Sequence, residues 1–165
     1  MQIIKISSIT YRFIVLNAIL LFFVNIAVFS QNDTAKMIKA EQVTDLLGSQ
    51  PYKVFSTFGF PHDVYSVCQN NDGLSVLDYR AFSFGILNKT VFNCTFYSSY
   101  PLPIMGIRFG DTQDQVIALL GAPTKVLDAE VADHVLTWLL LNLDVTFAVW
   151  FKDEKVMKIG IFLNQ

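Results

Sequence analysis

The stretch GIRFGDTQDQVIALLGAPTKV, residues 106–126, predicts the end of a strand, a tight turn, a short helix and an abrupt stop. Gly110 suits the turn. Asp111 or Thr112 can cap the helix, and Gln115 follows Thr112 at the spacing of a capping box. The apolar residues that follow lie along one side of a helix. The stretch therefore places one short amphipathic helix before the C-terminal strands.

The end of this helix is equally well marked, and the same pattern occurs twice. Gly121 can adopt a left-handed conformation after the last turn, and Pro123 prevents the helix from resuming. Residues 48–64 align with residues 110–126 without a gap, at an offset of 62 residues. The identical pairs are Gly48 and Gly110, Val54 and Val116, Gly59 and Gly121, Pro61 and Pro123, and Val64 and Val126. We therefore predict two copies of one structural unit.

Each copy continues into predicted strands. In the first copy, a helix over residues 35–47 and a second helix capped by Ser49 precede strands at 75–86, 90–97 and 104–109. In the second copy, the strands are predicted at 135–141, 144–151 and 155–163. The predicted fold is α+β, a tandem repeat of a helix–helix–three-stranded antiparallel meander with the helices on one face of the sheet.

Alternation along the strands separates a predicted core face from an outward face. The residues expected on the core face are Phe92, Cys94, Phe96, Met105, Ile107 and Phe109 in the first copy, and Phe147, Val149, Phe151, Met157, Ile159, Ile161 and Leu163 in the second. The residues expected to point outward are Asn93, Thr95, Tyr97 and Arg108, and Thr146, Trp150, Lys158 and Phe162.

The N-terminal segment has the pattern of a secretory signal peptide. Lys5 and Arg12 are the only charges before residue 33, and residues 13–29 form an almost wholly apolar run. This run is shorter than the roughly 20 residues that span a bilayer, and the residues before Gln31 suit a cleavage site. We predict cleavage after residue 30 and a periplasmic or secreted protein. The alternative is an uncleaved N-terminal segment that anchors the protein in the membrane.

The chain after residue 30 is long enough for one compact domain with its own core. We divide it into a first repeat, residues 31–109, and a second repeat, residues 110–165. Loss of Lys5 and Arg12 with the signal peptide takes the formal charge from −2 to −4, and no basic cluster remains. This mildly acidic balance argues against a nucleic-acid partner.

Cys68 and Cys94 are the only cysteines, and both lie in the predicted exported part. In an oxidising compartment a single disulfide between them is the natural interpretation, with a stabilisation on the order of 3 to 4 kcal/mol. The alternative is two buried free thiols. Metal binding together with His62 and His134 is disfavoured, because the sequence has no Cys-x-x-Cys or His-x-x-x-His spacing.

A longer pattern in the second copy resembles a known family. FGDTQDQV at residues 109–116 is followed by LLGAP at 119–123, by Trp138, and by VWFKDEKV at 149–156. This pattern resembles the SmpA/OmlA type of small envelope protein, which includes the small lipoprotein of the outer-membrane β-barrel assembly machine. Two such units in tandem are also similar to the secreted β-lactamase inhibitory proteins.

The resemblance implies a protein-binding role in the cell envelope or outside the cell. Two features depart from the family pattern. The family's lipoproteins carry a cysteine just after the signal, whereas this chain has Ser30, Gln31 and Asn32 there. This difference favours a soluble exported form without a lipid. The second copy is also absent from the single-unit assembly lipoproteins.

The sequence carries no recognisable catalytic motif. Gly-x-Ser-x-Gly, His-Glu-x-x-His and a phosphate-binding glycine loop are all missing. The carboxylate pair Asp111 and Asp114 suits a helix N-terminus, and the pair Asp153 and Glu154 suits a solvated turn. Because no base with an orienting partner can be identified, we predict a protein that is not an enzyme and binds no cofactor or metal.

The outward face of the predicted sheet remains as the candidate site. Tyr97, Arg108, Trp150, Lys158 and Phe162 on this face have the composition of a protein-binding patch. We therefore predict a non-enzymatic interaction module with a protein partner, accessory to outer-membrane or envelope assembly. One alternative is that the helices of the other copy cover this face. Others are a carrier of a small apolar ligand, a secreted enzyme-inhibitor-like protein, and an enzyme without a recognisable motif.

Overall fold

The computed structural model describes residues 40–67 and 73–164. The chain divides into two units, Met1–Lys36 and Met37–Gln165, and the described residues all belong to the second. The predicted signal peptide and Cys68 lie outside the described residues, as does the beginning of the helix predicted for residues 35–47.

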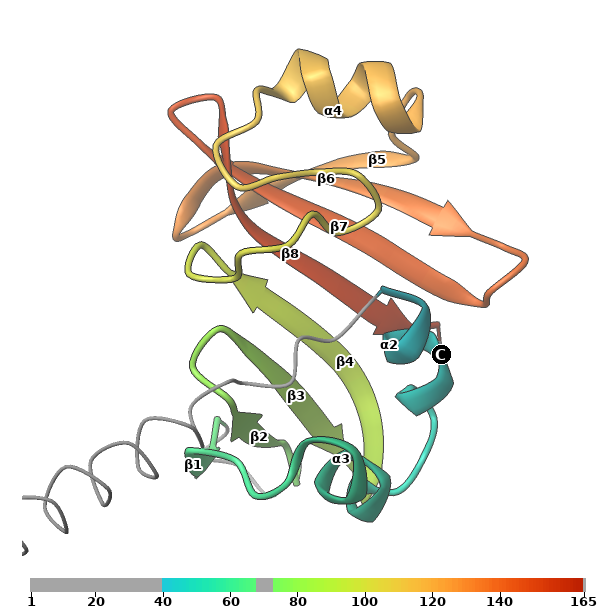
Figure 1. Ribbon diagram of the computed structural model, residues 1–165. Coiled ribbons are helices and arrows are strands. Elements are labelled where there is room, and N and C mark those ends of the chain that lie inside the picture. Colours follow the sequence, from blue (N-terminus) through green and yellow to red (C-terminus); the bar gives the residue numbers. More distant parts are fainter. Residues whose placement is uncertain (1–39, 68–72, 165) are drawn as a thin grey trace, which may run out of the picture. The chain divides into compact units, whose positions relative to one another are not determined.

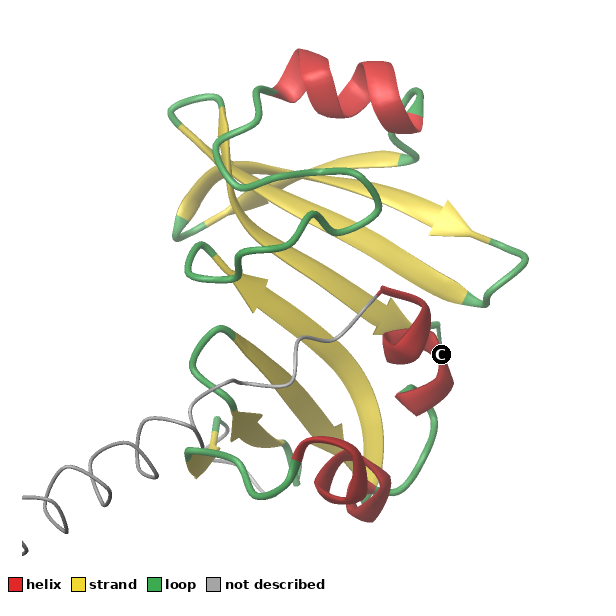
Figure 2. Ribbon diagram, viewed as in Figure 1, coloured by secondary structure: helices red, strands yellow, loops and turns green. Residues whose placement is uncertain are grey.

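The described elements form one antiparallel sheet with short helices before its first and fifth strands. Their bounds are α2 (Ala40–Leu46), α3 (Pro51–Phe58), β1 (Asp63–Ser66), β2 (Ser75–Asp78), β3 (Phe82–Leu87), β4 (Thr90–Tyr97), α4 (Gln113–Leu120), β5 (Lys125–Ala129), β6 (Ala132–Leu140), β7 (Val145–Lys152) and β8 (Lys155–Leu163). The strand order is β1-β2-β3-β4-β8-β7-β6-β5 (Figures 1 and 2). Strands β4 and β8 therefore pair at the centre, and β1 and β5 form the edges.

The predicted tandem repeat of a helix–helix–three-stranded meander is wrong, because the strands form a single eight-stranded sheet. Residues 104–109, predicted as a strand, belong to the loop between β4 and α4. There Met105 and Gly106 have φ values of 52° and 85°, and Ile104 forms an isolated bridge with Ile107. The edge strands β1 and β5 lack a regular alternation of buried and exposed residues, which is why the sequence pattern misses them.

Helix α4 begins as the sequence predicts. The hydroxyl of Thr112 accepts a hydrogen bond from the N–H of Gln115, and the Gln115 side chain accepts one from the N–H of Thr112. This pair is the predicted capping box. Helix α3 begins differently, because Gln50 and not Ser49 is its N-cap residue. The Ser49 hydroxyl instead donates to a carbonyl of α2 at 2.6 Å.

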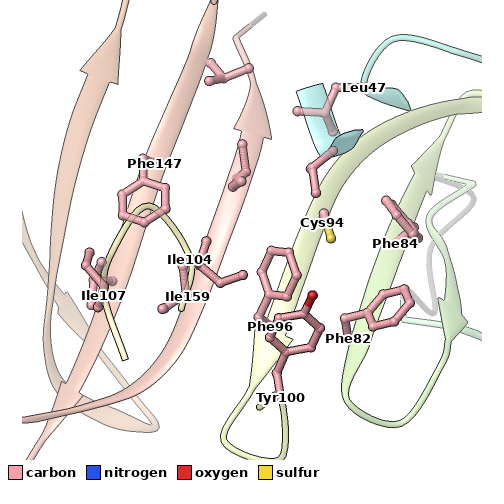
Figure 3. Close-up of a cluster of buried hydrophobic side chains, with 14 of the residues drawn as sticks. Leu47, Phe82, Phe84, Cys94, Phe96, Tyr100, Ile104, Ile107, Phe147 and Ile159 are labelled. Carbon is pink, nitrogen blue, oxygen red and sulfur yellow. The ribbon is translucent and has the colours of Figure 1, made fainter. Parts of the chain in front are cut away.

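One face of the sheet carries the hydrophobic core. The helices and the loop between β4 and α4 contribute Val43, Leu46, Leu47, Val54, Tyr100, Ile104, Ile107 and Val116 to this core. The sheet contributes, among others, Trp138, Val149, Phe151 and Ile161. Figure 3 shows its further core residues Phe82, Phe84, Cys94, Phe96, Phe147 and Ile159. Because all the described helices pack on this one face, no described helix covers the other.

Three residues predicted on the core face lie elsewhere. A β-bulge between β3 and β4 makes Phe92 the extra residue of its strand, and its ring contacts Phe162 on the opposite face. A bulge between β7 and β8 makes Met157 the extra residue, and Val156 takes the core position. Met105 is exposed in the loop after β4. One inserted residue reverses the alternation of a strand, so a period-two pattern fails at each bulge.

Cys94 is a free and fully buried thiol on β4. The predicted disulfide with Cys68 is not formed by this thiol, and Cys68 itself lies outside the described residues. Burial raises the pKa of Cys94 well above its usual value, so the side chain stays protonated at neutral pH. Cys94 therefore serves as a small apolar residue of the core.

Tyr79 makes the stability of the fold sensitive to alkaline pH. Its hydroxyl donates to the carbonyl of Gly59 at 2.9 Å, and burial raises its pKa from 10.0 to about 12. Between these values the unfolded chain loses the phenolic proton before the folded one, so stability should fall as the pH rises. We expect Tyr79→Phe to weaken this loss in denaturation curves at about pH 9 and pH 11. The exposed Tyr52→Phe is the control, and equal pH dependence in all three proteins would contradict the assignment.

Candidate functional site: the open face of the sheet

The open face is the face of the sheet opposite the core. On it Tyr97, Lys158 and Trp150 are direct neighbours across β4, β8 and β7. Phe162 lies on the same face of β8, and Phe92 joins it through the bulge in β4. These five residues are the open-face patch. The register therefore brings together, from strands distant in sequence, four of the five predicted interface residues.

The rings of the patch lie over a glycine. A Cβ on Gly160 would lie 2.6 Å from the ring of Phe162 and 3.0 Å from the ring of Trp150, so both side chains cross the space above this glycine. Their centroids are 6.0 Å apart, and Phe92 meets Phe162 edge-on at 5.8 Å. The three rings form a half-buried aromatic surface on this face.

Lys158 places a cation beside this aromatic surface. Its Nζ lies 4.2 Å from the centroid of the Trp150 ring, at a distance suited to a cation–π interaction. Burial lowers the pKa of Lys158, because the surrounding side chains remove water from the ammonium group. Within the described part of the chain, no carboxylate forms an ion pair with Lys158.

A groove of about 270 Å³, lined by polar and apolar side chains in about equal measure, runs from Lys158 toward β1. The Tyr97 hydroxyl lies 2.8 Å from that of Ser83. Burial raises the pKa of Tyr65, and Tyr97, Asp78 and Asp63 raise it further. The lining residues are Tyr65, Val67, Leu74, Val76, Ser83, Gly85, Phe92, Asn93, Thr95, Tyr97 and Lys158. The aromatic patch is therefore continuous with a groove that carries both polar and apolar side chains.

Gly85 fixes the position of Asn93 in this groove. The N–H of Gly85 donates to Oδ1 of Asn93 at 2.8 Å, and a Cβ on Gly85 would collide with that oxygen. We expect Gly85→Ala to lower the free energy of unfolding by about 1 to 3 kcal/mol through overpacking. The loss should be smaller in an Asn93→Ala background, as a double-mutant cycle would measure. Equal losses in both backgrounds would show that the side chain of Asn93 is not the obstacle.

Arg108 is the predicted interface residue that does not join the patch. It lies in the loop between β4 and α4, where its N–H donates to the carboxylate of Asp111 at 2.7 Å. The neighbouring Ile107 of this loop packs into the core, on the opposite face of the sheet. The sequence pattern does not indicate Phe92, Tyr65 and Ser83 as residues of this surface. A bulge moves the first to the open face, and the other two belong to strands whose ends were predicted incorrectly or not at all.

A second concave site lies beside α2. This pocket of about 320 Å³ is mostly apolar, and its lining residues are Thr44, Asp45, Met105, Leu140, Leu143, Val145 and Ile161. Its volume falls within the range of small-molecule sites, which starts at roughly 300 Å³. The turn between β6 and β7 beside it exposes Leu141 and Leu143.

The described residues provide no metal-binding cluster of His, Cys, Asp and Glu side chains. The two histidines have structural partners. His62 Nδ1 lies 3.2 Å from a guanidinium nitrogen of Arg80, and His134 Nε2 lies 2.6 Å from Oε1 of Gln113. In the same part of the chain, no helix is long and apolar enough to cross a membrane.

The architecture defines a class of protein: an open eight-stranded antiparallel sheet with helices on one face and an aromatic patch on the other. No family model and no curated protein matches the chain. Among solved structures, it is similar to a DUF4309 family protein (YjgB) from Bacillus subtilis. The TM-score is 0.51 at 13% identity, over 70% of this chain and 79% of that chain.

Two further similar structures are longer proteins. An extracellular protein containing a SCP domain from Bacillus anthracis has a TM-score of 0.51 at 10% identity, over 79% of this chain and 47% of that chain. A cysteine-rich secretory protein from Staphylococcus aureus has a TM-score of 0.48 at 12% identity, over 72% and 44%. The chain thus spans about half the length of these two. At such low identity the similarities concern the fold alone, and these neighbours are not of the SmpA/OmlA type.

Proposed function

We propose that the protein is an exported, non-enzymatic module that binds another protein through the open-face patch. The observation that carries this proposal is the grouping of three aromatic rings and one unpaired lysine on a sheet face that no described helix covers. Aromatic and cationic side chains often supply most of the binding energy of an interface. Binding there would leave the core on the other face undisturbed.

Export is the part of the proposal that rests on sequence. Residues 1–30 have the charge and apolar pattern of a signal peptide, which supports a periplasmic or secreted protein. The similar fold within an extracellular protein from Bacillus anthracis agrees with this location. The SmpA/OmlA resemblance implies a role in envelope assembly, and the alternative is a role as an enzyme inhibitor. The two roles would differ only in the partner that the patch binds.

Site-specific photocrosslinking in the native cells tests the proposal. A photoreactive phenylalanine analogue at Phe162 or Tyr97 should form a covalent adduct with one and the same protein. The same analogue at Leu119, an exposed residue of α4 on the core side, is the matched control and should not form that adduct. The proposal fails if Leu119 yields the adduct and the open-face positions do not.

The apolar pocket beside α2 supports a second candidate function, the carrier of a small apolar ligand. Its lining is mostly aliphatic, and Asp45 at its edge would disfavour a negatively charged head group. Native mass spectrometry of the protein purified from its own cells should then show a bound small molecule. Leu143→Lys should remove this molecule, whereas Trp150→Ala should retain it.

A further inference from the structure

The groove beside Lys158 offers two side-chain groups that can only donate hydrogen bonds, the ammonium of Lys158 and the amide NH₂ of Asn93. Asn93 already uses its carbonyl oxygen to accept the N–H of Gly85, which leaves its amide NH₂ to bond to a ligand. Thr95 adds a hydroxyl group to the same groove, whereas the Tyr97 hydroxyl already bonds to those of Ser83 and Tyr65. The ligand group that satisfies a cation together with such donors is an acceptor with negative charge.

The charge of Lys158 indicates what kind of anion fits. The ammonium group is partly removed from water, and its Nζ lies over the Trp150 ring. A single cation matches the single charge of a carboxylate, whereas a phosphate dianion is more often bound by several cations or a bidentate arginine. The groove therefore favours a carboxylate.

The position of the carboxylate within the groove follows from the acidic residues near it. Asp63 and Asp78 lie opposite each other on the neighbouring strands β1 and β2. Both carboxylates raise the pKa of Tyr65, which lines the groove at its β1 end. Both carboxylates accept backbone N–H groups, of Val64 and Arg80. Their repulsion places an incoming carboxylate at the Lys158 end, directly beside the aromatic rings.

We propose that the open-face patch recognises an acidic side chain flanked by an apolar side chain on the protein partner. The carboxylate lies against Lys158 and Asn93, and the apolar side chain lies on the rings of Trp150 and Phe162. This inference rests on the proposed function, because it specifies the chemistry of the partner that the patch binds.

Two capped pentapeptides test this chemistry. The first has the sequence Gly-Phe-Glu-Phe-Gly, and the second replaces its glutamate by glutamine, so the two differ by one carboxylate. Binding to the intact protein is measured by NMR titration. A charge-assisted hydrogen bond should make the glutamate peptide bind about tenfold more tightly. Its chemical-shift changes should map to β4, β7 and β8.

Three variants assign the preference to Lys158. Lys158→Met keeps the aliphatic stem and should abolish the preference, whereas Lys158→Arg should retain it. Lys53→Met removes an equal charge from the exposed side of α3 and should change nothing. Equal binding of both peptides, binding of neither, or a preference that survives Lys158→Met would overturn the inference. The proposed function would then still stand if Phe162 and Tyr97 crosslink to a common protein.

Discussion

Replacement of Trp138 by alanine should lower the free energy of unfolding by about 3 to 5 kcal/mol, the cost of removing a large aromatic side chain from a packed core. Trp138 is 5% exposed, and the centroid of its ring lies 6.3 Å from that of Phe147. Its indole N–H donates to the carbonyl of Gly121 at 3.1 Å. The substitution would leave a cavity between the sheet and the turn after α4, and would leave that carbonyl without its donor.

Chemical denaturation of the wild type and the variant measures this loss. Trp138→Phe should restore part of the lost stability, because it refills most of the cavity without the indole N–H. A loss below about 1 kcal/mol for Trp138→Ala would mean that this side chain is not part of the core.

Replacement of Trp150 by alanine should have the opposite profile. Trp150 is half-buried on the open face, so the substitution should reduce the free energy of unfolding by only about 1 kcal/mol. The substitution removes the ring over which the Lys158 ammonium lies and which packs beside Phe162. An interface aromatic of this kind contributes about 2 kcal/mol or more, so the Kd for the partner should rise about 30-fold or more.

Isothermal titration with the partner identified by crosslinking measures this loss. Leu141→Ala is the matched control, because it removes an exposed apolar side chain from the turn between β6 and β7. Unchanged affinity in Trp150→Ala, or an equal loss in Leu141→Ala, would place the binding surface away from the patch.

Local features of the fold were predictable where one physical rule acted alone. The strands at 90–97 and 155–163 and the capping box of Thr112 follow from alternation and from hydrogen-bonding chemistry, and the structure confirms them. The turn predicted at Asp153 and Glu154 is also confirmed, because both residues have positive φ values between β7 and β8.

The overall fold was not predictable by the same rules. The sequence pattern predicts a third strand at residues 104–109, but positive φ values at Met105 and Gly106 turn the chain back there. The loop buries Ile104 together with Ile107 and exposes Met105, whereas a strand would point Ile104 and Ile107 to opposite faces. The pairing of β4 with β8 joins all the strands into one sheet, and such long-range pairing leaves no local signal.

In the candidate site, too, some residues were predictable from local rules and others were not. Tyr97, Trp150, Lys158 and Phe162 lie on one face, as alternation along β4, β7 and β8 predicts. Alternation places Arg108 on that face only if residues 104–109 form a strand, and that condition fails. The contribution of Phe92 depends on a bulge opposite Gly85 and Ile86, which a period-two pattern cannot contain.

We propose that the partner binds the open face of the sheet and not the helix-covered face. The chain has two tryptophans, one on each face of the sheet, so their indole N–H signals in an NMR spectrum report on the two faces separately. On addition of the partner, we predict a large shift of the Trp150 signal and an unchanged Trp138 signal. A shift of the Trp138 signal with an unchanged Trp150 signal would contradict the account.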